Sequence, residues 1–147
     1  MSEAHNELVA RGKRWLRNQG CRVILADPFR ANVPSGEQPD VIGWRDGLSI
    51  LLEAKVSRSD FMADRSKKFR VSPELGMGDW RYFLCPPDVI KPDDLPQGWS
   101  LLWAHERKIE VVHGGPRGNV WWADKPFEGH KRSETCLLVS AMARGIA

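Results

Sequence analysis

The chain has 147 residues, of which 22 are Lys or Arg and 19 are Asp or Glu, so its formal net charge at pH 7 is +3. Hydrophobic residues make up 41% and charged residues 28%, a globular mixture that excludes a disordered chain, a collagen-like repeat and a coiled coil. The length predicts a single domain over residues 1–147, with a core large enough to fold without disulfides.

Three widely spaced cysteines, Cys21, Cys85 and Cys136, form no CxxC pair. They indicate buried thiols in a reducing compartment, and neither a zinc site nor a disulfide framework. The first residues carry charges throughout and lack an apolar signal segment. The longest apolar runs fall far short of the roughly 20 residues that a membrane-spanning helix needs. We therefore expect a soluble, cytoplasmic protein with no membrane partner.

The beginning of the chain predicts a helix, a strand and a loop. Apolar residues recur at helical spacing over residues 2–18, and Gly20 is a suitable helix stop. Residues 21–26 are rich in aliphatic and β-branched side chains and predict a short strand. Residues 29–39 contain Pro, Gly, Ser and Asn, so we expect a loop there.

A tight hairpin is predicted around Asp46-Gly47, because a type I′ turn requires positive φ at both of its central positions. Strands are expected over residues 40–45 and 48–56. Without a bulge, the register set by this turn brings Asp40 opposite Glu53. Their Cβ atoms are then expected roughly 4.5–5.5 Å apart.

The remaining segments continue the mixture of helices and strands. Residues 57–70 predict one helix, capped by Ser57 or Ser59. Residues 80–85 predict a strand, residues 86–99 a connection with one short helical turn, and residues 100–114 a second hairpin. After a Gly/Pro-rich loop, residues 133–145 predict a helix with Ser133 as its cap. The helix over residues 57–70 is expected to place four side chains on one face: Phe61, Met62, Arg65 and Phe69.

The order of these elements is α-β-β-β-α-β, followed by further β and α elements. Such a mixture predicts an α/β fold with a mixed central sheet flanked by helices. The core is expected over about residues 3–112, and a C-terminal β-α extension over about residues 113–147.

Three charged groups are expected to converge at the end of the first hairpin. Glu53 and Lys55 are two residues apart on one strand, so they point to the same face as Asp40 opposite them. Directly opposed carboxylates repel, and Lys55 supplies only one positive charge. A divalent cation such as Mg²⁺ prefers oxygen ligands and would offset the remaining repulsion. The alternative is a hydrated sheet end, where Lys55 screens the two acids.

The combination of Pro39-Asp40 with Glu53-Ala54-Lys55 resembles the motif of the PD-(D/E)XK nuclease superfamily. The continuation EAKVSRSDFMADRSKKFR, followed by WRYFLCPP, is similar to the MmcB-like DNA-repair and phage-borne branch of that superfamily. The resemblance spans roughly residues 7–103. It implies a restriction-endonuclease-like version of the α-β-β-β-α-β core.

The resemblance implies a metal-dependent nuclease that hydrolyses DNA phosphodiester bonds, in DNA repair or phage DNA metabolism, within a bacterial or phage-infected cell. Asp40 and Glu53 would bind Mg²⁺ or Mn²⁺ together with the main-chain carbonyl of Ala54. Lys55 would position or help to deprotonate the attacking water and would stabilise charge on the scissile phosphate.

Members of the superfamily often add an acid from the first helix, and Glu7 is a better match here than Glu3. Many of these folds dimerise to cut both strands, so a homodimer is a further hypothesis. Two alternatives compete with a nuclease. One is a catalytically inactive DNA-binding module of the same fold. The other is a phage protein-interaction factor or inhibitor, for which neither DNA affinity nor metal binding is expected.

The helix predicted after Lys55 is basic. Its Lys and Arg residues outnumber Asp60 and Asp64 by as much as the formal excess of the whole chain. Because this helix follows the metal-binding strand, we expect it to contact DNA phosphates. The alternative is a solvated helix face with an Asp64–Lys68 pair. The candidate DNA contacts are Arg58, Arg65, Lys67, Lys68 and Arg70.

Trp121 and Trp122 lie in the Gly/Pro-rich loop beside Arg117 and Lys125. Single-stranded bases stack on exposed aromatic rings in such surroundings. Packing against the protein body is the favoured interpretation, because Trp usually buries much of its area.

Overall fold

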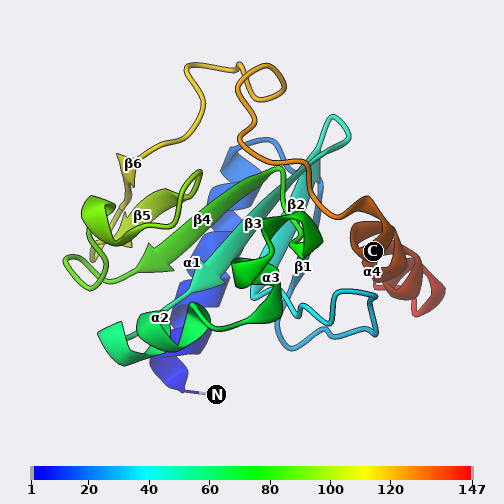
Figure 1. The fold of residues 1–147 in the computed structure, drawn as a ribbon, viewed down its shortest axis with the longest axis horizontal. Coiled ribbons are helices and arrows are strands. Elements are labelled where there is room, and N and C mark those ends of the chain that lie inside the picture. Colours follow the sequence, from blue (N-terminus) through cyan, green and yellow to red (C-terminus); the bar gives the residue numbers. More distant parts are fainter. Residues whose placement is uncertain (1, 147) are drawn as a thin grey trace.

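The computed structural model describes residues 2–146 as a six-stranded mixed sheet with helices on both faces (Figure 1). The strands follow one another across the sheet in chain order. Pairing is parallel between β3 and β4 and between β4 and β5, and antiparallel between the other neighbours. The predicted α/β fold is therefore confirmed, but the predicted C-terminal β-α extension is wrong in one part, because residues 114–146 contain a helix over Lys131–Ala143 and no strand. The strands are β1 (Val23–Ala26), β2 (Val41–Arg45), β3 (Leu48–Ala54), β4 (Trp80–Cys85), β5 (Ser100–Ala104) and β6 (Ile109–His113).

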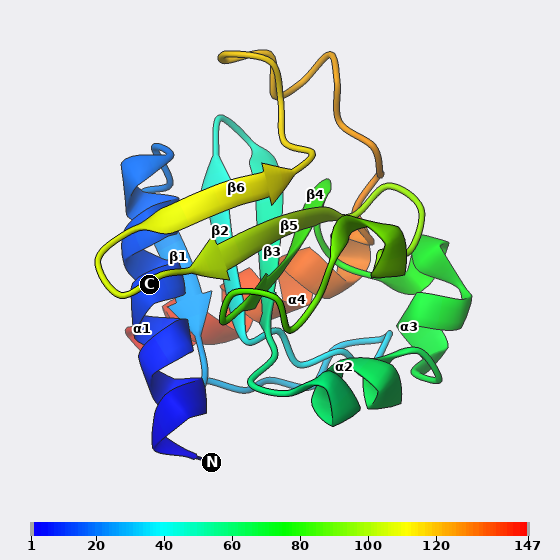
Figure 2. The ribbon, with the colours of Figure 1, turned by 90° about the vertical axis from the view of Figure 1, so that its left-hand side faces the viewer.

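The helices form a layer on each face of the sheet. They are α1 (Glu3–Asn18), α2 (Arg58–Asp64), α3 (Lys68–Val71) and α4 (Lys131–Ala143), with 3-10 turns η1 (Pro73–Leu75) and η2 (Pro92–Asp94). α1 covers one face, and α2, α3 and α4 lie over the other (Figures 1 and 2). None of the helices described over residues 2–146 combines the length and the apolar character needed to traverse a bilayer.

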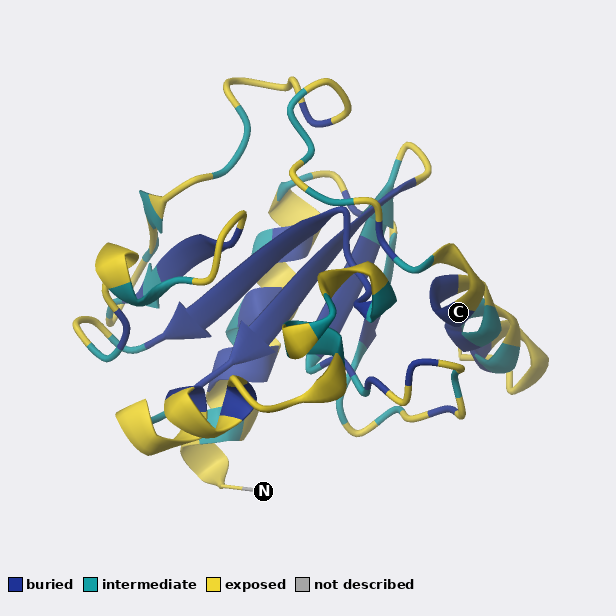
Figure 3. Cartoon of the chain, viewed as in Figure 1, coloured by how far each residue is buried: buried dark blue, intermediate teal, exposed yellow. Residues whose placement is uncertain are grey.

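The two central strands, β3 and β4, are buried along their whole length (Figure 3). Alternate residues of β3 belong to two separate apolar clusters, so that Leu52 packs towards α1 and Leu51 towards α2 and α4. Burial on both faces explains why these strands are continuously apolar in sequence. Gly12 lets α1 approach this layer closely, since an added Cβ would lie 3.0 Å from Leu52 Cδ1.

The hairpin between β2 and β3 has the predicted turn and register. Gly47 has a φ of 74° and the preceding residue a φ of 49°, as a type I′ turn requires. The ladder then runs without a slip to the pair Val41 and Leu52. One further step of the same register leads to Asp40 and Glu53, just beyond the last pair of strand residues.

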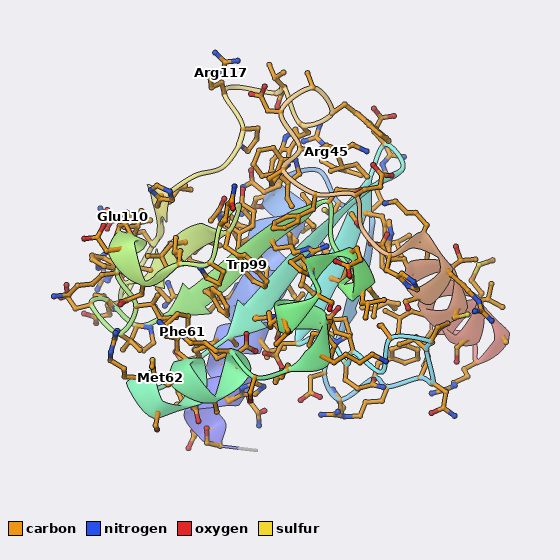
Figure 4. The ribbon with its side chains drawn as sticks, in the orientation of Figure 1. Arg45, Phe61, Met62, Trp99, Glu110 and Arg117 are labelled. Carbon is orange, nitrogen blue, oxygen red and sulfur yellow. The ribbon has the colours of Figure 1, made fainter. Side chains whose placement is uncertain are left out.

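The single helix predicted over residues 57–70 is wrong, because the segment is divided into α2 and α3. Ser57 caps α2 as predicted, but Lys67 is extended, with φ −64° and ψ 141°, and interrupts the helix before α3. This break allows Arg70 to turn inward. The predicted face is also wrong for Met62, which is 44% exposed, whereas Phe61 packs on the sheet with 1% exposure (Figure 4).

Other details also differ from the prediction. β3 ends at Ala54, two residues before its predicted end. α4 begins at Lys131 rather than at residue 133, and its N-cap is His130 instead of Ser133. The His130 imidazole accepts a hydrogen bond from the Ser133 main-chain N–H, so this ring replaces the predicted hydroxyl as the cap.

A buried polar network fastens α4 and the loop before it to the sheet. The Asp79 carboxylate accepts hydrogen bonds from the main-chain N–H groups of Ser49 and Gly129. Lys131 Nζ lies 2.7 Å from the same carboxylate. Burial alone would raise the pKa of Asp79, but these donors hold it below its ordinary value.

Trp121 follows the favoured interpretation and packs against the protein. It is 5% exposed and meets Trp80 edge-on, with their ring centroids 5.5 Å apart. Trp122 is 47% exposed, and its indole N–H donates to the main-chain oxygen of Asp46. For Trp122, base stacking stays the alternative to the favoured packing.

The hairpin turn is sensitive to the residue at position 47. Gly47→Val places a β-branched residue at positive φ, which costs about 1–2 kcal/mol. We expect the melting temperature to fall by roughly 3–6 °C, as measured by circular dichroism. Gly47→Asn is the matched control, because Asn tolerates this conformation. Equal melting temperatures for Gly47→Val and the unaltered chain would contradict the turn assignment.

Candidate active site

The acids predicted at the hairpin end meet at a cavity of about 560 Å³ beside the last residues of β3. Asp40, Glu53, Ala54 and Lys55 all line it. Glu53 lies on the sheet face that α2 and α3 cover, because its strand neighbour Leu51 belongs to the apolar cluster on that face. The structure therefore brings together the four residues of the predicted centre.

Burial and the facing Glu53 favour the protonated form of Asp40 when the cavity contains no cation. Its Oδ2 accepts a 2.8 Å hydrogen bond from the Ala54 main-chain N–H. Burial, then the charge of Glu53 and hydrogen bonding with Glu53, raise the pKa of Asp40 to about 9. The Ala54 N–H and the nearby Lys55 oppose this rise without cancelling it. The opposed carboxyl groups thus avoid carrying two full negative charges.

Arg70 is enclosed by three carboxylates from different parts of the fold. It donates to Asp64 at 2.7 Å, to Glu53 at 2.8 Å and to Glu37 at 3.0 Å, and its side chain is only 3% exposed. Burial alone would lower the pKa of Arg70, but the three acids outweigh it and raise the pKa above its ordinary value. Arg70 therefore fixes Glu53 Oε1 and offsets part of the negative charge of the three acids.

Asp64 positions the amine of Lys55. Asp64 Oδ1 lies 3.1 Å from Lys55 Nζ and 3.1 Å from Lys67 Nζ. Burial would raise the pKa of Asp64, but Arg70 and the two lysines hold it below its ordinary value. Because the side chain of Lys55 is 9% exposed, this ion pair offsets the cost of burying its charge at the cavity wall.

The donor atoms in this cavity fit a hard divalent cation. Three buried polar atoms of its lining, His5 Nε2, Gln38 Oε1 and Asp64 Oδ1, lack a hydrogen-bond partner among residues 2–146. Asp64 Oδ1 nevertheless forms ion pairs with two lysines. His5 Nε2 lies 3.6 Å from Asp40 Oδ1. The described part of the chain gathers no three His, Cys, Asp or Glu side chains into a ready-made metal group. Mg²⁺ is usually bound through one or two carboxylates together with several waters, so the pair Asp40 and Glu53 is compatible with such an ion.

The first helix brings a different residue to the cavity from the one predicted. Glu7 lines a neighbouring hollow, and the exposed Glu3 lies outside the lining of both. Sequence reasoning missed His5, although a signal was present. His5 is at helical spacing with Val9 and Leu16 on the buried stripe of α1, whereas Glu7 is off that stripe.

The five predicted DNA contacts lie in different surroundings. Arg58 is held by the Asp94 carboxylate, with two hydrogen bonds of 2.8 and 2.7 Å. Arg70 is buried among acids, so it is withdrawn from any surface contact with DNA. Lys67 lines the cavity and is 43% exposed. The two remaining candidates, Arg65 and Lys68, are exposed.

The fold and the cavity together define an α/β protein with an acid–amine cluster at the end of a central strand. No family model and no curated protein matches the chain. Among solved structures, it is similar to a protein of unknown function from Silicibacter pomeroyi, with 25% sequence identity and a TM-score of 0.61. The alignment covers 95% of this chain and 88% of that one, which supports the α/β fold over nearly the full length.

Removal of the Arg70 charge leaves buried acids uncompensated. We expect Arg70→Met to destabilise the protein by about 3–5 kcal/mol at pH 8, as measured by urea unfolding. The loss should be smaller at pH 5, because Glu37, whose pKa burial raises to about 6, is then protonated in the folded state. Lys68→Met on the same helix is the control. An equal effect of both substitutions would contradict the role of Arg70.

Asp40 makes stability depend on pH in the opposite sense to an ordinary ion-paired acid. Its pKa is raised to about 9, so the unfolded chain loses this proton at lower pH than the folded one, and stability falls as pH rises towards 9. In EDTA, we expect Asp40→Asn to increase the melting temperature, by a margin that grows between pH 5 and pH 9. Glu3→Gln should show no such trend. A constant margin for Asp40→Asn would contradict the raised pKa.

Proposed function

We propose that this chain is a Mg²⁺- or Mn²⁺-dependent nuclease that hydrolyses DNA phosphodiester bonds, in DNA repair or phage DNA metabolism. The observation that supports it best is the convergence of Asp40, Glu53 and Lys55 on one cavity that also holds the unpartnered His5 Nε2. The same residues carry the resemblance to the PD-(D/E)XK superfamily. In this proposal the cation, when bound, neutralises charge on the phosphate and lowers the pKa of a water molecule.

The residues of the chain have separate tasks in the proposed reaction. Asp40 and Glu53 would supply carboxylate oxygens to the cation, and the nearby positive charge would favour the ionised form of Asp40. The Ala54 N–H orients Asp40 through its 2.8 Å hydrogen bond. Lys55 stabilises the negative charge that develops on the phosphate oxygens, a role that requires no change in its protonation.

Two further residues position this machinery without touching the substrate. Arg70 holds Glu53 Oε1 at 2.8 Å, which leaves the other carboxylate oxygen free of this contact. Asp64 holds Lys55 Nζ at 3.1 Å. Both contacts are buried, so the side chains of Glu53 and Lys55 are restrained before substrate binds.

The proposal is tested by cleavage of supercoiled plasmid and of single-stranded and double-stranded oligonucleotides. We expect cleavage in Mg²⁺ or Mn²⁺ and none in EDTA. Asp40→Asn and Lys55→Ala should each reduce the rate by about 100-fold or more, and His5→Ala should raise the Mg²⁺ concentration needed for half-maximal cleavage. Glu3→Gln, on the same helix as His5, is the matched control and should cut at the rate of the unaltered chain.

Three results would overturn the proposal. Equal rates for Asp40→Asn, Lys55→Ala and the unaltered chain would exclude this site. DNA binding that needs no divalent ion and leads to no cleavage would favour an inactive DNA-binding module. Absence of both DNA affinity and metal binding, with salt-independent association with a protein, would favour an interaction factor.

A further inference from the structure

A second hollow, of about 470 Å³, lies between the C-terminal half of α1 and the turn that joins β5 to β6. Its lining carries four basic side chains against the single acid Glu106. The floor includes the half-buried ring of Trp15. The four basic side chains are Arg11, Arg14, Arg107 and Lys108.

The positive charge of this hollow is offset only in part, because Glu106 is the single acid of its lining. Arg11 donates to the main-chain oxygen of Lys108 at 3.1 Å, which ties α1 to the β5–β6 turn. Across residues 2–146, the side chains of Arg14, Arg107 and Lys108 make no ion pair within 4.0 Å. Like charges gathered in one concavity repel one another and attract an anion.

The basic residues of α2 and α3 differ in this respect. Arg58 is paired with Asp94, and Arg70 is buried among three acids. Lys67 forms an ion pair with Asp64. Much of the charge that the sequence assigns to DNA contact is therefore used within the protein. The hollow beside α1 is the stronger candidate for binding a polyanion.

Shared lining residues lead from this hollow towards the cavity that holds Asp40. A third hollow, of about 190 Å³, lies between them and shares Val56 with the Asp40 cavity and Arg11 with the basic hollow. α1 forms a wall of all three, from His5 to Asn18, and Figure 2 shows the β5–β6 turn beside this helix. At 1.5 Å per residue this wall is about 20 Å long, or roughly six nucleotides of a B-form strand.

We propose that the basic hollow is a phosphate-binding subsite and that a DNA strand lies along α1, with its scissile phosphate at Asp40, Glu53 and Lys55. The choice of DNA as occupant rests on the proposed function. Arg14 and Arg107 bind flanking phosphates, since a guanidinium can donate two parallel hydrogen bonds to a phosphate. Lys108 adds a third cation at the turn.

The subsite is tested by measuring DNA binding to Arg14→Ala/Arg107→Ala at several salt concentrations. The probe is a fluorescently labelled 20-nucleotide DNA, single-stranded or duplex. Every protein in the comparison also carries Asp40→Asn, so that the probe stays intact. We expect affinity to fall about tenfold at low salt and the slope of log K against log salt to become shallower by roughly 1.4–1.8, as two lost phosphate contacts predict.

The matched control is Lys13→Ala/Arg132→Ala, which removes the same charge from exposed positions of α1 and α4. Melting temperatures of both double variants establish that they fold, and Arg107→Glu provides a second variant on the exposed turn. If the hollow variants and the control have the same salt slope, the subsite is wrong.

Failure of the subsite and failure of the nuclease give different results. Metal-dependent cleavage by the unaltered chain, with equal salt slopes for the hollow variants and the control, overturns only the subsite. A shallower slope confined to the hollow variants, without any cleavage in Mg²⁺ or Mn²⁺, supports the subsite and overturns the nuclease.

Discussion

The guanidinium of Arg70 joins a loop, a strand and a helix through the carboxylates of Glu37, Glu53 and Asp64. Glu53 and Asp64 line the cavity and Glu37 lies beyond its lining. The mutual repulsion of these three acids would otherwise oppose the packing of α2 and α3 on the sheet. The arginine replaces that repulsion with charge-assisted hydrogen bonds in a region of low dielectric. The position of Glu53, and through Asp64 the position of Lys55, both depend on it.

The second constraint is the turn at Asp46-Gly47. It sets the register of the hairpin, and so the positions of Asp40 and Glu53, each six residues from the turn. A slip of one residue would move the acids to opposite faces of the sheet. The observed ladder has no slip between β2 and β3, so Asp40 and Glu53 meet on one side. The turn brings Asp40 and Glu53 together, and the contact with Arg70 holds Glu53 in place against the repulsion between them.

The sequence predicted the features that depend on local rules. The turn chemistry of residues 46 and 47, the register of the first hairpin and the convergence of Asp40, Glu53 and Lys55 were all deduced from spacing. The break at Lys67 could not be deduced, because it depends on acids that Arg70 meets in three dimensions. The pairing of Arg58 with Asp94 was hidden for the same reason, since η2 lies on a later segment.

The contribution of α1 was only partly accessible from the sequence. Its buried stripe was visible in the spacing of apolar residues, and His5 lies on that stripe. Glu7 was predicted as the site residue of this helix because it is an acid, although it does not lie on the buried stripe. The basic hollow combines residues of α1 with residues of the β5–β6 turn, almost a hundred positions apart, so charge counting along the chain gave no sign of it.

The loop between β6 and α4 has a practical consequence. It is fastened by Trp121 against Trp80 and by Gly129 against Asp79, while Arg117 between β6 and these anchors is 88% exposed (Figure 4). Lengthening a loop that is already closed at its base adds little entropy cost. The residues around Gly118 therefore offer an insertion point for a spectroscopic reporter or an affinity tag that leaves the sheet undisturbed.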